Sequence, residues 1–174
     1  MKPTPYTLWL TGLSASGKTT LADALAQEFT RRGVPCEVLD GDVLRQKLSA
    51  DLGFSRADRS ENIRRVAALC RQLNDAGKVV IAALISPYAV DRAMAREMIG
   101  AGRMVEVYMA TSLAVCESRD PKGLYRRARA GTLPHFTGVS DPYEAPAQPE
   151  LRFDTDGHAV ADCVAGVFEW LAGG

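Results

Sequence analysis

One loop near the start of the chain restricts its fold more than any other feature of the sequence. It matches the pattern G-x-x-x-x-G-K-[ST] at every fixed position, with an apolar run before it and an amphipathic stretch after it. The two glycines let the backbone curl so that successive N–H groups point at phosphate oxygens. The sequence therefore predicts a nucleoside-triphosphate site between a strand and a helix, formed by Gly12, Leu13, Ser14, Ala15, Ser16, Gly17, Lys18, Thr19 and Thr20.

Two side chains of this loop have predicted tasks beyond the backbone cradle. Lys18 is expected to bridge the β- and γ-phosphates of ATP, and the Thr19 hydroxyl is expected to hold Mg²⁺. The helix that begins near Lys18 adds the positive end of its dipole. The prediction is therefore a site for ATP with Mg²⁺ as the cofactor.

Strands and helices alternate along the rest of the sequence. Short segments rich in apolar residues predict strands at residues 6–12, 36–40, 78–86, 104–110 and 151–157. The run at 78–86 is continuously apolar, as in parallel strands that are buried on both faces. Helical spacing of apolar residues predicts helices at 18–33, 59–77, 88–102, 112–119 and 158–174. This order indicates an α/β fold of the three-layer phosphate-loop nucleotide-hydrolase type, with a parallel sheet flanked by helices. Because neither a repeat nor a linker divides the sequence, residues 1–174 are expected to form one domain.

Polar clusters follow three of the predicted strands, at residues 12–19, at Asp40 to Asp42 and at Ser86-Pro87. The carboxyl ends of parallel strands meet at one edge of a sheet, which is where ligands bind in such folds. We therefore expect the three clusters to converge on one site.

Carboxylate and basic side chains beyond the loop indicate an anionic acceptor for the phosphoryl group. Asp42, with Asp40 beside it, can accept the proton of an acceptor hydroxyl or hold Mg²⁺ through water. The alternative role for either aspartate is to cap the helix that follows. Arg59 and Asn62 are three residues apart and share a helix face, and together with Arg45 they could bind an anion.

The composition argues against several other classes of protein. The 21 basic and 21 acidic side chains cancel, so the net charge favours neither duplex nucleic acid nor an anionic membrane as a partner. No segment approaches about 18 consecutive apolar residues, and the first apolar run is too short for a signal peptide, so a cytoplasmic protein is expected. The four separated cysteines and two histidines favour buried thiols over a zinc site.

A phosphate loop alone leaves three classes of function open: a small-molecule kinase, a switch GTPase, and a nucleotide-binding regulatory or scaffold protein. A GTPase needs D-x-x-G after a core strand and N-K-x-D to read guanine. Residues 120–123 and 154–157 match D-x-x-G by their letters, but neither N-K-x-D nor T-K-x-D occurs in the sequence. The sequence therefore disfavours a GTPase.

A series of motifs in fixed order resembles adenylylsulfate kinases, which use ATP to phosphorylate the 3′-hydroxyl of adenosine 5′-phosphosulfate (adenylylsulfate). The motifs run from about Trp9 to about Asp156 and read GLSASGKTT, LDGD, DLGFS, DRSENIRR, ISPY, RDPKGLY, ARAG, FTG and DPYEAP. The resemblance implies production of 3′-phosphoadenosine 5′-phosphosulfate (PAPS) and ADP in sulfate assimilation. The alternatives are a related kinase for a different nucleotide anion and a catalytically silent nucleotide-binding regulatory protein.

The resemblance also implies roles for individual residues. Asp42 matches the residue that orients or deprotonates the 3′-hydroxyl, and Arg119 matches a residue that packs against the adenine of ATP. The segment at about 119–146 corresponds to a mobile lid that excludes water. The matched acceptor contacts are Asp42, Arg45, Phe54, Arg59, Asn62, Ile85, Ser86, Lys122 and Phe136, of which the two phenylalanines enclose the acceptor adenine.

Three positions need separate interpretation. The family serine that matches Ser86 is often described as a phosphorylated intermediate, but direct in-line transfer needs no covalent relay, so we expect Ser86 to position the acceptor. Ala15 stands where family members often have glycine, and Val43 stands where asparagine is common. Because alanine tolerates a left-handed backbone poorly, Ala15 is where we expect a departure in the loop.

The expected partners are ATP and adenylylsulfate, with neither nucleic acid nor a membrane among them. Members of the family commonly pair their subunits, so the resemblance implies a homodimer. A sulfurylase is a further candidate partner.

Overall fold

The computed structural model describes residues 5–173 and is built on one five-stranded sheet. The strands lie in the order β2-β3-β1-β4-β5, and every neighbouring pair is parallel, which confirms the predicted α/β architecture. The strands are β1 (Thr7–Thr11), β2 (Cys36–Asp40), β3 (Val79–Ala83), β4 (Met104–Met109) and β5 (Leu151–Phe153).

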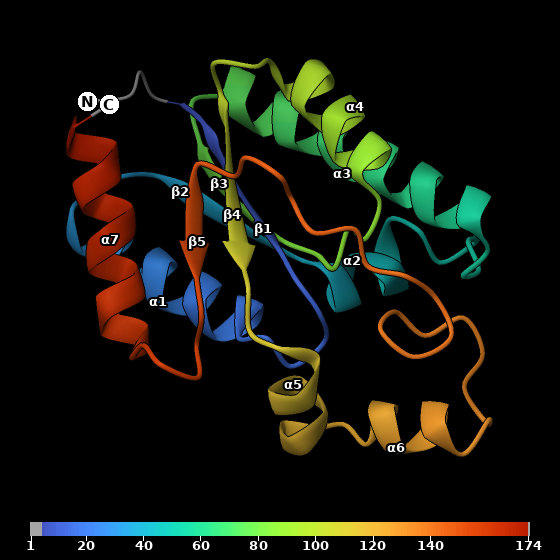
Figure 1. Cartoon of the computed structure of the whole chain (residues 1–174). Coiled ribbons are helices and arrows are strands. Elements are labelled where there is room, and N and C mark those ends of the chain that lie inside the picture. The colour runs from blue at the N-terminus through green and yellow to red at the C-terminus, as the bar shows by residue number, and fades with distance from the viewer. Residues whose placement is uncertain (1–4, 174) are drawn as a thin grey trace.

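Helices cover both faces of this sheet and form the outer two of three layers. Figure 1 shows α1 and α7 on one face and α3 and α4 on the other, while α5 and α6 lie beyond the end of β4. The helices are α1 (Lys18–Arg31), α2 (Gly41–Lys47), α3 (Arg56–Asp75), α4 (Ala89–Ile99), α5 (Leu113–Arg119), α6 (Leu124–Arg129) and α7 (Val160–Gly173). Among residues 5–173, no helix combines the length and the apolar character that crossing a membrane would require.

Strand β1 demonstrates why the central strands are apolar throughout. Its side chains alternate between the faces of the sheet, so Leu8 and Leu10 pack against α1 and α7. Trp9 points to the opposite face and packs with residues of α3 and α4. All three side chains are fully buried, so β1 fixes the position of the phosphate loop, which begins directly after it.

Helices α1, α4 and α7 are each shorter than predicted, and α3 differs at its start. Helix α3 begins at Arg56 rather than at residue 59, because the Ser55 hydroxyl accepts a hydrogen bond from the Asp58 N–H and caps the helix. The segment at about 119–146, which the resemblance implied to be a lid, includes the six-residue helix α6. As predicted, the thiols of Cys70, Cys116 and Cys163 are buried, and all four cysteines are free.

Candidate active site

The loops that follow β1, β2 and β3 meet around one cavity of about 560 Å³, the main cavity. The phosphate loop contributes Lys18 and Thr19, and the junction of β2 and α2 contributes residues 40–42. The turn after β3, here named the β3 turn, contributes Ile85, Ser86 and Pro87. The predicted convergence of the three polar clusters is therefore confirmed.

Close packing explains the glycines of the phosphate loop. A Cβ atom at Gly12 would lie 2.7 Å from the Met109 carbonyl oxygen, a distance that a side chain cannot occupy. Gly17 has a φ of 97° and provides the left-handed residue immediately before α1. Ala15 also has a positive φ, 64°, so an alanine here adopts a left-handed conformation that favours glycine. For an L-residue this conformation costs about 1–2 kcal/mol.

The Lys18 ammonium folds back over the phosphate loop. Its Nζ donates hydrogen bonds to the carbonyl oxygens of Gly12, at 2.9 Å, and Leu13, at 2.6 Å. Burial lowers the pKa of Lys18 to about 8, against the partly compensating attraction of Asp42 and Asp40. The charged form of Lys18 therefore lacks a strong counter-charge, which phosphate oxygens in the main cavity would supply.

Of the two aspartates after β2, Asp40 is the helix cap. Its Oδ1 accepts hydrogen bonds from the N–H groups of Asp42, at 2.9 Å, and Val43, at 3.4 Å, and so begins α2. Its Oδ2 accepts a hydrogen bond of 2.9 Å from the Thr19 hydroxyl. The Asp42 carboxylate takes no part in the cap; it is exposed and forms an ion pair with Lys122 of the lid segment.

Thr19 and Asp40 present the kind of oxygen atoms that Mg²⁺ prefers. A hydroxyl and a carboxylate lie together at the start of α1, next to the lysine of the phosphate loop. Mg²⁺ in nucleotide sites is typically bound by one or two such groups together with phosphate oxygens. The donor set therefore fits the predicted cofactor.

An aromatic and basic wall lies opposite the phosphate loop. The Arg45 guanidinium lies over the Phe54 ring, 4.7 Å from its centroid, and the Phe54 side chain is 58% exposed. Phe136 of the lid segment is buried, with its ring 5.0 Å from that of Tyr125 in an edge-on arrangement. The wall thus combines one solvent-exposed ring with one that is fixed by packing.

Two polar residues of α3 line the same wall and are buried. Arg59 donates hydrogen bonds to the carbonyl oxygens of Phe54 and His135 and to the Thr137 hydroxyl, so it joins the start of α3 to the lid segment. Asn62 Oδ1 is buried and has no hydrogen-bond partner among the described residues. An unpaired buried acceptor is costly, and a donor group of a bound molecule would satisfy it.

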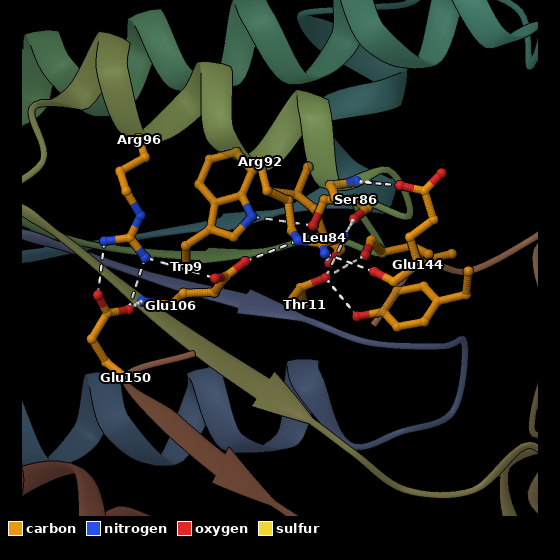
Figure 2. A network of polar contacts seen from close by, with 12 residues as sticks. Trp9, Thr11, Leu84, Ser86, Arg92, Arg96, Glu106, Glu144 and Glu150 are labelled. Atoms are coloured by element: carbon orange, nitrogen blue, oxygen red, sulfur yellow. Dashed lines mark hydrogen bonds and ion pairs between the residues drawn. The ribbon is translucent and has the colours of Figure 1, made fainter. Parts of the chain in front are cut away.

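The Ser86 hydroxyl takes part in contacts within the protein core. It accepts a hydrogen bond of 3.1 Å from the indole N–H of Trp9 and donates one of 3.4 Å to the Leu84 carbonyl (Figure 2). Among the described residues, no histidine, lysine or carboxylate hydrogen-bonds to it. This arrangement provides no base to activate Ser86 as a nucleophile, in agreement with a positioning role.

A second cavity of about 210 Å³ also borders the phosphate loop. It is lined by Gly17, Thr20 and Arg119, which the sequence assigned to ATP, together with Thr155 and His158. Arg119 donates hydrogen bonds to the hydroxyl, at 2.8 Å, and the carbonyl, at 3.1 Å, of Thr155.

Thr155 and His158 were not predicted as site residues. The available signal was DTDG at residues 154–157, which directly follows β5 and so reaches the same edge of the sheet. The wall residues Leu133, Pro134, His135 and Thr137 of the main cavity were not predicted either. The predicted acceptor residues that line this cavity are Asp42, Arg45, Phe54, Arg59, Asn62, Ile85, Ser86, Lys122 and Phe136.

Known proteins are similar to this chain in sequence and fold. Residues 4–154 match the family model described as adenylylsulphate kinase. The adenylyl-sulfate kinase of Pseudomonas entomophila is 54% identical over 167 residues, which span 96% of this chain and 80% of that protein. The corresponding protein of Marinobacter nauticus is 51% identical, with 96% of this chain and 84% of that protein covered.

A solved structure extends the similarity to three dimensions. The APS kinase CysC of Mycobacterium tuberculosis, in complex with AMPPNP and APS, superposes with a TM-score of 0.93. The two chains are 44% identical, and the match covers 98% of this chain and 99% of that one. On this evidence, the chain belongs to the adenylylsulphate kinase family of phosphate-loop kinases.

Proposed function

We propose that the chain transfers the γ-phosphoryl group of ATP to the 3′-hydroxyl of adenylylsulfate, giving PAPS and ADP. The observation that carries this proposal is the main cavity, where the phosphate loop faces a carboxylate, two arginines and two aromatic rings. These groups suit an acceptor that is both an anion and a purine. The similarity to a kinase bound to AMPPNP and APS supports the same pair of substrates.

The phosphate loop is the donor side of the proposed reaction. The triphosphate lies along the loop, where its oxygens replace the carbonyl groups of Gly12 and Leu13 as partners of Lys18. The adenine of ATP lies in the second cavity, against Arg119. The Thr19 hydroxyl, with Asp40 beside it, would hold Mg²⁺, which neutralises phosphate charge when it is bound.

The aromatic and basic wall is the acceptor side. Phe54 and Phe136 enclose the acceptor adenine, and Arg45 and Arg59 face its phosphosulfate. The unpaired Asn62 Oδ1 accepts a hydrogen bond from a hydroxyl or amino group of the acceptor. The lid segment covers the reacting groups and keeps water from taking the phosphoryl group.

Asp42 carries the proton transfer in this mechanism. Its carboxylate accepts the proton of the 3′-hydroxyl while the 3′-oxygen forms a bond to the γ-phosphorus and the bond from that phosphorus to the leaving oxygen of ADP breaks. The Lys122 ammonium forms an ion pair with the Asp42 carboxylate in the folded chain. It therefore lies next to the phosphoryl group and stabilises the negative charge that develops there during transfer.

An assay with Mg-ATP and adenylylsulfate tests the proposal, with the appearance of PAPS and ADP as the readout. Asp42→Asn should lower kcat by about 10²–10⁴-fold, because the general base is lost, while ATP binding remains. Asp23→Asn, on the exposed face of α1, is the matched control and should leave kcat unchanged.

Two other outcomes would replace the proposal. ADP formed only with another acceptor would indicate a related kinase for a different nucleotide anion. ATP binding without turnover on any acceptor would indicate a regulatory protein. Normal turnover by the Asp42→Asn variant would remove this residue from the mechanism.

A further inference from the structure

A buried guanidinium outside the main cavity holds the β3 turn in place. Arg92 of α4 is 4% exposed and uses its three nitrogens on three different segments (Figure 2). It donates to the Ser86 carbonyl at 2.8 Å, to Glu106 Oε1 of β4 at 2.9 Å, and to the Glu144 carbonyl at 2.6 Å. Arg92 is not among the residues that line the main cavity, so its action on a substrate would be indirect.

The β3 turn has a shape that its own sequence does not favour. Ser86 has a φ of 41°, in the region that side-chain-bearing residues seldom adopt. Such a conformation persists where the surrounding structure determines it from several directions. Here the Thr11 hydroxyl donates to the Ile85 carbonyl at 2.7 Å, the Trp9 indole donates to the Ser86 hydroxyl, and Arg92 donates to the Ser86 carbonyl.

The third segment bound by Arg92 is the end of the lid segment. The Glu144 N–H donates to the Pro87 carbonyl at 2.8 Å, and the Glu144 carboxylate accepts from the Ala89 N–H at the start of α4. Next to it, the Tyr143 hydroxyl lies 2.9 Å from the Thr11 hydroxyl. One guanidinium thus fixes the β3 turn and the end of the lid segment relative to each other.

We propose that Arg92 is a positioning residue for the acceptor. By holding the carbonyl groups of Ser86 and Glu144 together, it sets the shape of the β3 turn against which adenylylsulfate binds. The inference rests on the proposed binding of the acceptor at this turn. Only arginine carries donors in a rigid planar fork that can reach the three acceptors at once, whereas lysine is a flexible point charge.

Arg96 provides a matched control one turn further along α4. It pairs with Glu150 through two contacts of 2.8 Å and approaches Glu106 at 3.7 Å, so it belongs to the same network, in a half-buried position. Its remaining hydrogen bond goes to the Met104 carbonyl and not to the β3 turn. Loss of the Arg96 fork should therefore affect stability without changing the turn.

The test compares Arg92→Lys with Arg96→Lys in steady-state kinetics with each substrate varied. Arg92→Lys should raise KM for adenylylsulfate about tenfold and leave KM for ATP within about twofold, because only acceptor placement is disturbed. Arg96→Lys should leave both KM values within about twofold. Both substitutions keep a positive charge beside Glu106, and both should lower Tm.

The indole of Trp9 gives a second readout, because its N–H binds the Ser86 hydroxyl. The chain has two tryptophans, so Trp9 is observed alone in a Trp170→Phe background. In that background Arg92→Lys should shift the emission maximum, and Arg96→Lys should not. If the substitutions changed only overall stability, Tm would fall in both variants and the emission maximum of Trp9 would stay the same.

Two results would overturn the inference: an unchanged KM for adenylylsulfate in Arg92→Lys, or an equal rise for both substrates in both variants. If Arg92→Lys does not fold, the uncharged pair Arg92→Gln with Glu106→Gln is compared with Arg96→Gln and Glu150→Gln. The Phe54→Ala variant distinguishes an error in the role of Arg92 from an error in the proposed function. It raises KM for adenylylsulfate if the acceptor binds in the main cavity, whether or not Arg92 positions the turn.

Discussion

At the scale of single residues, Ser86 demonstrates how the surroundings decide the role of a functional group. A serine that lines a phosphoryl-transfer cavity could be a nucleophile, but this hydroxyl is held by Trp9 and Leu84. Transfer through it would require loss of the hydroxyl proton and of the hydrogen bond to Leu84, without a base to accept that proton. The contacts therefore favour a structural use of the hydroxyl and direct transfer between the substrates.

The Ser86→Ala variant should retain kcat within about tenfold of the original protein, since no covalent step is lost. Its free energy of unfolding should fall by about 1 kcal/mol, because the Trp9 indole N–H loses its acceptor. Kinetics and urea denaturation measure the two quantities on the same preparation. A folded Ser86→Ala protein with kcat reduced more than a thousandfold would instead indicate a phosphoserine intermediate.

Lys18 gives a prediction about pH. In the folded chain its pKa is lowered from 10.5 to about 8, and phosphate oxygens would raise it again by favouring the charged form. Above pH 8, binding of ATP should therefore be accompanied by proton uptake, and its affinity should weaken as pH rises toward 10.5. Calorimetry at pH 8.5 in buffers of different ionisation enthalpy measures the uptake.

Lys18→Met is the control for this linkage, because it removes the titrating group. The residual ATP binding of that variant should show no proton uptake at pH 8.5. Uptake of the same size in both proteins would mean that another group titrates.

At the scale of elements, the sequence reveals the buried strands and the helix after the phosphate loop, because their apolar patterns are unambiguous. It does not reveal the start of α3, since the first two turns of that helix are polar and its apolar series begins only at Ile63. It also obscures α6, which is short and lies in a segment rich in Gly, Pro and charge. Local pattern thus predicts long buried elements and misses short or polar ones.

The two aromatic residues of the acceptor wall lie on different elements and should respond differently to truncation. Phe54 precedes α3 and is exposed, so Phe54→Ala should raise KM for adenylylsulfate about tenfold through lost stacking and leave Tm unchanged. Phe136 packs against Tyr125 in the lid segment, so Phe136→Ala should also lower the free energy of unfolding, by about 3 kcal/mol.

Kinetics and thermal melting of both variants test this contrast. Val90→Ala, on the exposed side of α4, is the control and should change neither quantity. If Phe54→Ala lowered Tm as much as Phe136→Ala did, the exposed ring would have a structural role instead.

At the scale of the whole molecule, the site depends on contacts between distant parts of the chain. The sequence predicts that Asp42 and Ser86 reach one edge, because parallel strands deliver their ends there. It cannot predict the contact of Arg92 with Glu144, which lies 52 residues away along the chain, or that of Arg119 with Thr155. These contacts follow from how the lid segment and β5 return to the sheet, which no local spacing encodes.

The return of the chain to the sheet is secured by Glu150. Its carboxylate pairs with Arg96 and accepts a hydrogen bond of 2.6 Å from the Glu106 N–H. Burial alone would raise the pKa of Glu150, but the hydrogen bonds from Arg96 and from the backbone lower it below the usual 4.5. The stability that Glu150 contributes is therefore present above pH 4.5 and is lost as pH falls through the lowered value.

Glu150→Gln should cost about 2 kcal/mol of unfolding free energy at pH 6, where the charged pair is lost. The difference from the original protein should shrink steadily as pH falls below 4.5, and thermal melts between pH 3 and 7 measure it. Glu97→Gln, on the exposed side of α4, should show no such dependence. If the difference in unfolding free energy stayed constant from pH 3 to 7, the Arg96–Glu150 pair would not be its cause.

Consecutive residues of the phosphate loop line different cavities: Lys18 and Thr19 face the main cavity, and Gly17 and Thr20 face the second. In the proposed reaction the nucleophile therefore approaches the phosphorus from the main cavity, and ADP leaves from the opposite side. The three oxygens that stay on the phosphorus then invert their arrangement once per catalytic cycle, as in any single in-line displacement. Each transfer inverts the stereochemical configuration at phosphorus, whereas passage through a serine ester would restore it.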